Sequence, residues 1–207
     1  MPEVDEHLRR LLPAPGDWQA TTMRRAAVLC PLVRRFGEDF VLVLRRPDDA
    51  RQHPGQLGFP GGMRNGDESP LETALRECDE EVGVGSAHVT VLGELPHRPS
   101  SSGILVHCLV GRVADVPLRP DPREVLRVVW LPLAELRDEQ RWADLPPPPP
   151  YPQPQPGQPR FLSPHFLHGE DLLWGLTGRF VRDLVTTLAR ASTEPGTCDN
   201  PAPPSGC

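Results

Sequence analysis

Residues 58–84 read GFPGGMRNGDESPLETALRECDEEVGV, and this stretch joins a glycine-rich loop to a strong helix signal. Ser69 is a suitable N-cap residue, and Glu72 completes a Ser-x-x-Glu capping box with it. Gly83 suits the C-cap position because glycine readily takes a positive φ. Together these signals predict a helix over about residues 70–82.

One face of this helix is apolar and the other is acidic. Glu77, Glu80 and Glu81 fall three and four positions apart, so their carboxylates share one face. Such a face is more commonly a solvated surface, but like charges at this spacing destabilise a helix, as does their position near its C-terminus. The adjacent Gly61-Gly62 lets backbone atoms approach a ligand closely. Carboxylates with a backbone carbonyl are the oxygen ligands that Mg²⁺ prefers, which predicts a metal site for phosphate chemistry.

The same residues carry a family resemblance. Their spacing matches every defining position of a Nudix box except one, where Cys78 replaces the usual larger aliphatic residue. The matching residues are Gly62, Glu68, Arg76, Glu77, Glu80, Glu81, Gly83 and Val84. The stretch therefore resembles the signature of the Nudix hydrolase family. The resemblance implies hydrolysis, dependent on Mg²⁺ or Mn²⁺, of a nucleoside diphosphate linked to a further group.

The resemblance also implies a role for each residue of the box. It makes Glu77, Glu80, Glu81 and the carbonyl of Gly62 the metal ligands. Arg76 would orient the glutamates, Glu68 would anchor Arg76, and Gly83 would end the helix. The general base of such an enzyme is either a glutamate of the box or one from a distant loop. Glu124 is the candidate for the second case, although a lone glutamate is more often plain surface.

The rest of the chain predicts an α/β fold, which the resemblance specifies as a Nudix-type α/β/α sandwich with a mixed β-sheet. Alternating and apolar runs predict a hairpin and three later strands, and amphipathic segments predict helices at both ends of the chain. The predicted strands are Ala26–Val33, Phe40–Leu44, Val89–Leu95, Ile104–Val113 and Val125–Leu131. The predicted helices, besides the acidic one, cover residues 4–12, 133–140 and 176–190.

A second motif precedes the box and narrows the choice among possible nucleoside diphosphate substrates. The run from Leu42 to Gly62 keeps the spacing that marks the coenzyme A diphosphatase branch of the Nudix enzymes, with Leu44 and Pro47 as departures. The implied substrate-binding residues are Arg46, Arg51, His53, Gly55, Phe59 and Gly61. Coenzyme A carries a 3′-phosphate besides its diphosphate, and Arg46, Arg51 and His53 would supply cationic donors for it.

The resemblance thus implies cleavage of coenzyme A or acyl-coenzyme A into 3′,5′-ADP and 4′-phosphopantetheine or its acyl form. Other readings stay open. In the first alternative, the enzyme acts on ADP-ribose, NADH or a damaged dNTP. In the second, the protein is a catalytically inactive nucleotide-binding regulator. A scaffold that uses its proline run to recruit partners is the third reading. His165 and His168 are expected to be surface residues on a loop.

Composition excludes several other classes. The net charge is −6, which disfavours general nucleic-acid binding, and all 22 basic residues are arginine, which excludes lysine-dependent phosphate loops and Schiff-base chemistry. No apolar run reaches the roughly 18 residues that span a bilayer. The charged N-terminus and the five unpaired cysteines predict a cytoplasmic protein without membrane contact. The expected partner is a small nucleotide diphosphate substrate, and a homodimer is left open.

The predicted organisation has three parts. Residues 1–22 form an N-terminal helix and linker, residues 23–190 form the Nudix hydrolase domain, and residues 191–207 form a disordered tail. The domain carries a proline-rich insertion at 146–160, for which polyproline II or disorder is expected.

Overall fold

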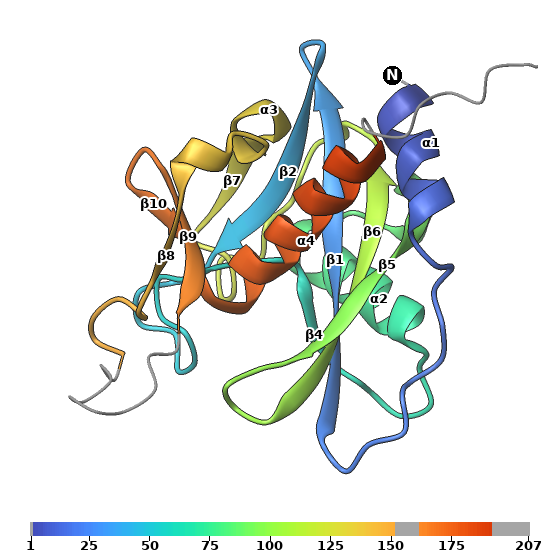
Figure 1. The fold of residues 1–207 in the computed structure, drawn as a ribbon. Helices are drawn as coiled ribbons and strands as arrows, with labels where there is room; N and C mark the ends of the chain where they lie inside the picture. Colours follow the sequence, from blue (N-terminus) through green and yellow to red (C-terminus); the bar gives the residue numbers. More distant parts are fainter. Residues whose placement is uncertain (1, 152–161, 192–207) are drawn as a thin grey trace, which may run out of the picture.

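A seven-stranded mixed β-sheet forms the centre of the computed structural model, which describes residues 2–151 and 162–191 (Figure 1). Five strands run in the order β3-β2-β1-β6-β5, with β4 paired to β1 and β7 paired to β2. Their bounds are β1 Arg24–Arg35, β2 Glu38–Arg45, β3 Leu57–Gly58, β4 Gly61–Met63, β5 Val89–Pro99, β6 Ile104–Val113 and β7 Arg127–Pro132.

The sheet is mixed because β1 makes one parallel and two antiparallel pairings. It forms the predicted antiparallel hairpin with β2, and it runs parallel to β6 from Arg24↔Ile104 to Val33↔Val113. Strand β4 pairs with the other end of β1, where Ala27 lies opposite Gly62. Since β1 is covered on both faces, its apolar run is nearly continuous.

Helices cover both faces of the sheet. Helix α2, Pro70–Val82, lies behind it in Figure 1, whereas α1, Pro2–Leu11, and α4, Gly175–Ala191, lie in front and contact each other. Each face has its own apolar core: Ala74, Cys78 and Val82 of α2 pack on one side, and α1 and α4 pack on the other. The expected α/β/α sandwich is confirmed, and the limits of α1, α2 and α4 lie within two residues of the prediction.

A second, three-stranded sheet was absent from the prediction. It has the order β10-β9-β8, with bounds β8 Trp142–Leu145, β9 Ser163–His168 and β10 Asp171–Leu173. His165 and His168 therefore lie on a strand and not on a loop, and His165 is buried. That expectation was wrong because the strand becomes visible only through its partners. The predicted helix at 133–140 is only α3, Leu133–Leu136, followed by a 3₁₀ turn at Glu139–Arg141; another 3₁₀ turn covers Ser86–His88.

Some predictions fall on residues that the structure does not describe. Most of the proline-rich insertion, residues 152–160, and the tail from residue 192 lie outside the described ranges, together with Cys198 and Cys207. Residues 146–151 are described and form neither helix nor strand. Cys30, Cys78 and Cys108 are buried thiols. Within the described ranges, every helix lacks the length and apolar character needed to cross a membrane.

Gly93 gives a test of how α1 docks on the sheet. A Cβ atom at Gly93, whose φ is +153°, would lie 2.4 Å from Cβ of Leu12 and 2.9 Å from the carbonyl oxygen of Pro13. We expect Gly93→Ala to lower the free energy of unfolding by about 2 kcal/mol or more, because backbone at the end of α1 must move. Urea unfolding followed by circular dichroism measures the change.

Gly103→Ala is the matched control. Gly103 also has a positive φ, at +72°, but a Cβ atom there would have no neighbour within 4 Å. It should therefore lose only about 1 kcal/mol from backbone strain. Equal losses in the two variants would contradict the close approach at Gly93.

Candidate active site

The first turn of α2 is fixed by the predicted capping box. The amide of Ser69 donates to Oε2 of Glu72 at 2.8 Å, and the amide of Glu72 donates to Oγ of Ser69 at 3.2 Å. At the other end Gly83 takes a left-handed conformation with φ of 72°. These caps hold the start and end of the helix, and so set the direction in which its glutamates point.

Arg76 is the centre of an ion-pair cluster on this helix. Its Nε donates to Oε1 of Glu68 at 2.7 Å, and its Nη1 donates to Glu77 at 2.8 Å and to Glu80 at 3.0 Å. The hydrogen bond from Arg76 is the main cause that lowers the pKa of Glu68. Nη2 also donates to the carbonyl oxygen of Met63, at 3.3 Å. Arg76 thus ties two glutamates of α2 to the loop that precedes the helix.

The backbone at Gly62 lies directly against the carboxylate of Glu77. A Cβ atom on Gly62 would lie only 2.2 Å from Oε1 of Glu77, so no other residue fits without displacing the carboxylate. Burial is the main cause that raises the pKa of Glu77, and the charge of Glu80 adds to it. The structure therefore brings the backbone of Gly62 and the first glutamate of the cluster into contact.

Glu81 is the most buried carboxylate of the cluster. Its side chain is buried beneath the loop, and the amide of Gly61 donates to its Oε2 at 3.0 Å. Burial raises the pKa of Glu81 to about 8, while the positive charge of Arg46 acts in the opposite direction. A buried acid of this kind favours a nearby cation when it is ionised.

Glu124 is brought to the same place from a distant part of the chain. Its negative charge raises the pKa of both Glu77 and Glu81, so it lies within electrostatic reach of both. The loop that carries it is held to the end of α2: the amide of Asp121 donates to the carbonyl oxygen of Glu81 at 2.9 Å. The side chain of Glu124 is exposed, which leaves it accessible to water.

The donor set of this cluster fits a hard divalent cation. Three carboxylates and a glycine backbone converge, and the guanidinium of Arg76 reaches only Glu77 and Glu80 among the three. Burial keeps the pKa of Glu81 raised, and a bound cation would favour the ionised form of this carboxyl. Oxygen-rich, partly hydrated sites of this kind suit Mg²⁺ or Mn²⁺.

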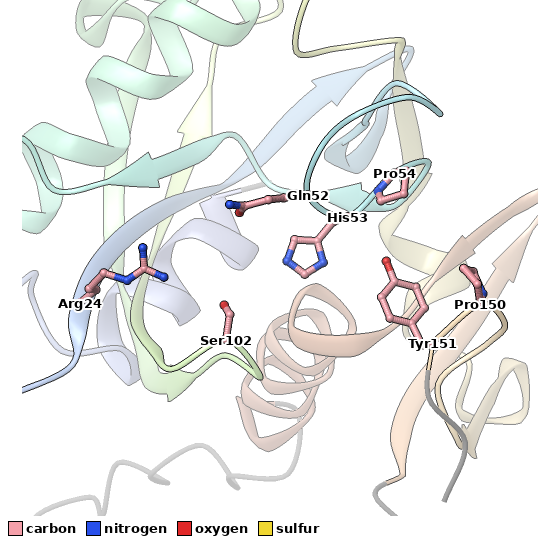
Figure 2. A pocket seen from close by; sticks show the side chains of 7 residues that line it. All are labelled: Arg24, Gln52, His53, Pro54, Ser102, Pro150 and Tyr151. Atoms are coloured by element: carbon pink, nitrogen blue, oxygen red, sulfur yellow. The ribbon is translucent and has the colours of Figure 1, made fainter.

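The loop between β2 and β3 leads from this cluster to a cavity of about 350 Å³. Arg46 begins the loop and lies within electrostatic reach of both Glu81 and His53. Partial desolvation, and then the charge of Arg46, lower the pKa of His53. Figure 2 shows the side chains that line the cavity, which are Arg24, Gln52, His53, Pro54, Ser102, Pro150 and Tyr151.

The other predicted substrate-binding residues lie outside this lining. Arg51 is exposed on the loop. Gly55 has a φ of +67° and its amide donates to the carbonyl oxygen of Pro47, so it forms a turn. Phe59 is buried in the apolar core beneath the loop. Gly61 contributes its backbone amide to Glu81.

Sequence reasoning missed several side chains near the site. Arg24, Ser102 and Tyr151 line the cavity from three separate segments, and Tyr151 is held edge-on to Trp174 with ring centroids 4.8 Å apart. A group of Glu94, His97 and His107 was also missed. Its members lie on adjacent strands, so only the β5–β6 pairing, with its irregular register, brings them together.

The comparisons with known proteins agree with this site. A family model described as the NUDIX domain matches residues 23–151. The chain belongs to the Nudix hydrolase family. It is 37% identical over 172 residues to proteins named uncharacterised Nudix hydrolase NudL of Yersinia pestis and of Yersinia pseudotuberculosis, with 82% of each chain covered.

A solved structure supports the fold alone. The MutT/nudix family protein from Enterococcus faecalis aligns with a TM-score of 0.55 and 17% identity, over 84% of this chain and 64% of that one. As a Nudix hydrolase, the protein acts on pyrophosphate bonds in nucleoside diphosphate derivatives, in a family that uses divalent metal ions.

The raised pKa of Glu81 predicts an unusual stability effect. Its pKa is about 8 in the fold, against an ordinary value of 4.5. Between these two values the folded protein binds more protons than the unfolded chain, so the free energy of unfolding falls as the pH rises. We expect metal-free Glu81→Gln protein to melt a few degrees above metal-free wild type near pH 8. Thermal unfolding in EDTA measures this difference.

The same experiment carries its own controls. Near pH 4.5 the difference in Tm should shrink, because the destabilisation of the wild type accumulates only as the pH rises from 4.5 towards 8. Added Mg²⁺ should stabilise the wild type more than the variant. A variant that melts below the wild type at both pH values would contradict a destabilising buried charge at Glu81.

Proposed function

We propose that the enzyme hydrolyses the diphosphate bond of coenzyme A or acyl-coenzyme A, releasing 3′,5′-ADP and 4′-phosphopantetheine or its acyl form. The observation that carries this proposal is the position of Arg46, which lies within electrostatic reach of Glu81 in the carboxylate cluster and of His53 in the cavity lining. It joins the carboxylate cluster to the loop whose sequence resembles the coenzyme A motif, so that one substrate reaches both.

The cavity suits the 3′-phosphoadenosine end of coenzyme A. The ring of Tyr151, with Pro54 and Pro150, offers an apolar surface for a base, and base stacking on an aromatic ring is favourable. Arg24 supplies a permanent positive charge for the 3′-phosphate, and His53 supplies a ring nitrogen. Its volume lies within the roughly 300–1,000 Å³ typical of small-molecule sites.

In the proposed mechanism each residue of the cluster has a distinct task. Glu77, Glu80, Glu81 and the Gly62 carbonyl would hold the divalent ions, which would neutralise charge on the diphosphate. Arg76 fixes the direction of Glu77 and Glu80 through its two short ion pairs. Glu124, exposed and close to the buried carboxylates, accepts a proton from the attacking water. Arg46 orients the diphosphate between cluster and cavity.

Product analysis tests which substrate the enzyme cleaves. The full-length protein is incubated with Mg²⁺ or Mn²⁺ and, separately, with coenzyme A, ADP-ribose, NADH and dGTP, and products are identified by mass spectrometry. We expect preferential release of 3′,5′-ADP from coenzyme A. Cleavage of another substrate with coenzyme A untouched would overturn the assignment but keep the hydrolase site. No turnover of any of the four would favour the nucleotide-binding regulator.

Glu80→Gln tests the carboxylate cluster. We expect turnover to fall by at least ten- to a hundredfold, because the variant keeps its shape but loses one charged ligand. Circular dichroism should show an intact helix. Asp79→Asn is the matched control, since Asp79 is an exposed neighbour on the same helix, and it should keep wild-type turnover. Unchanged kinetics in Glu80→Gln would remove the argument for the site.

Arg24→Gln tests recognition of the 3′-phosphate. We expect KM for coenzyme A to rise about tenfold with little change in kcat, since a charge-assisted contact away from the reacting bond is lost. With dephospho-coenzyme A, which lacks the 3′-phosphate, the rise should be much smaller. Arg25→Gln serves as control on the same strand. Equal rises for both substrates would place the 3′-phosphate elsewhere.

A further inference from the structure

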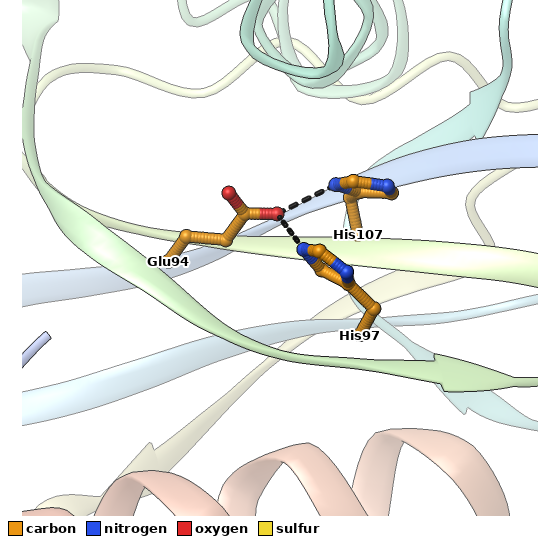
Figure 3. Close-up of side chains that lie close together, drawn as sticks. All are labelled: Glu94, His97 and His107. Carbon is orange, nitrogen blue, oxygen red and sulfur yellow. Dashed lines mark hydrogen bonds and ion pairs between the residues drawn. The ribbon is translucent and has the colours of Figure 1, made fainter. Parts of the chain in front are cut away.

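Glu94, His97 and His107 form a compact group on strands β5 and β6, separate from the carboxylate cluster of α2 (Figure 3). Nε2 of His97 and Nδ1 of His107 both contact the same oxygen, Oε1 of Glu94, at 2.9 and 2.6 Å. The two imidazole rings are stacked, with centroids 3.9 Å apart. Two ring nitrogens and one carboxylate oxygen therefore converge on one point, all within 4.8 Å of one another.

The group is held in place by its surroundings. Glu94 is 3% exposed and His107 is fully buried. The amide of Gly16 donates to Oε2 of Glu94 at 3.0 Å, which fixes the carboxylate and leaves Oε1 for the histidines. The ring of Trp18 packs edge-on against His107, with centroids 4.9 Å apart. Such supporting contacts orient the ligands of metal sites.

The group is also open on one side. The side chain of His97 is 29% exposed, so an ion and a water molecule can reach the point of convergence from the solvent. Two histidines and one glutamate are a ligand set that zinc uses with water in the fourth position. Mg²⁺ avoids imidazole and prefers oxygen. The chemistry of this group therefore differs from that of the α2 cluster.

Only a small movement is needed to admit an ion. Ligands at about 2.0–2.1 Å from a tetrahedral zinc are separated by about 3.3 Å. The nitrogen–oxygen distances of 2.9 and 2.6 Å would have to open by less than about 1 Å. Rotation of the partly exposed His97 gives that freedom, while Glu94 and His107 stay fixed.

We propose that Glu94, His97 and His107 form a second metal site, which binds a zinc-type transition metal ion independently of the divalent ions of the hydrolase site. The site stabilises the segment that follows α1, because Glu94 holds Gly16 and His107 holds Trp18. Nε1 of Trp18 in turn donates to the carbonyl oxygen of Glu68, the residue that anchors Arg76. The metal thus supports the position of the α2 cluster from the neighbouring strands.

Metal binding to the full-length protein tests this proposal. Cys198 and Cys207 are changed to serine throughout, so that their thiols do not bind zinc. The protein also carries Glu80→Gln and Glu81→Gln, and the buffer contains excess Mg²⁺. Zinc uptake is measured by equilibrium dialysis with metal analysis. We expect one equivalent of zinc to remain bound in this background, whereas uptake at the hydrolase site should be abolished.

His97→Gln is the decisive variant, and His88→Gln is its control. Glutamine can still donate a hydrogen bond to Glu94 but replaces the imidazole ligand, whereas His88 is an exposed histidine outside the group. Zinc affinity should fall at least tenfold in His97→Gln and stay unchanged in His88→Gln. Equal zinc uptake in both variants would overturn the site, and so would the absence of bound zinc in the starting background.

Two further measurements separate the metal site from a merely structural triad. Cobalt(II) in place of zinc should give the strong visible absorption of tetrahedral coordination, and His97→Gln should lose it. Zinc should raise Tm of the starting protein but not that of His97→Gln, whose Tm without metal shows that it is folded. A rise in Tm without cobalt absorption or retained zinc would mean that the metal acts elsewhere, and would overturn the proposal.

Discussion

The ion pairs of the Arg76 guanidinium are the contacts on which the candidate active site depends. Three carboxylates within reach of one another on a helix and its preceding loop would repel and disperse without them. Because a guanidinium is planar and offers five donors, it holds Glu68, Glu77 and Glu80 in one arrangement at once. The helix caps, the glycine loop and the pairing of β4 with β1 then serve to keep Gly62 and Glu81 within reach of that arrangement.

The sequence was most informative where interactions are local. The capping box, the C-cap glycine and the spacing of the glutamates involve neighbours within four or five positions, so α2 was predicted with its limits. The hairpin of β1 and β2 followed from two apolar runs that are close in the sequence. Glu124, although distant in sequence, could also be named as a candidate general base. Its approach to Glu77 and Glu81 depends on backbone contacts between its loop and the end of α2.

Prediction failed where the signal lies in pairing between distant segments. Strand β9 contains a proline and two histidines and has no clear alternation, and it becomes a strand only because β8 and β10 flank it. The cavity draws its lining from segments more than one hundred residues apart, such as Arg24 and Tyr151. The triad of Glu94, His97 and His107 depends on a register shift between β5 and β6. The sequence pattern of neither strand predicts this shift.

The segment before residue 23 packs against the sheet, although it lies outside the family match. Leu8 and Leu12 are buried in the core on the α4 face, while Trp18 reaches the opposite face and contacts Glu68. The N-terminal segment therefore packs on both faces of the sheet, although the family match begins only at residue 23. The unit of homology and the unit of folding do not coincide. Fragments cut at the homology boundary would expose core leucines and remove the hydrogen bond from Trp18 to Glu68, the residue that pairs with Arg76.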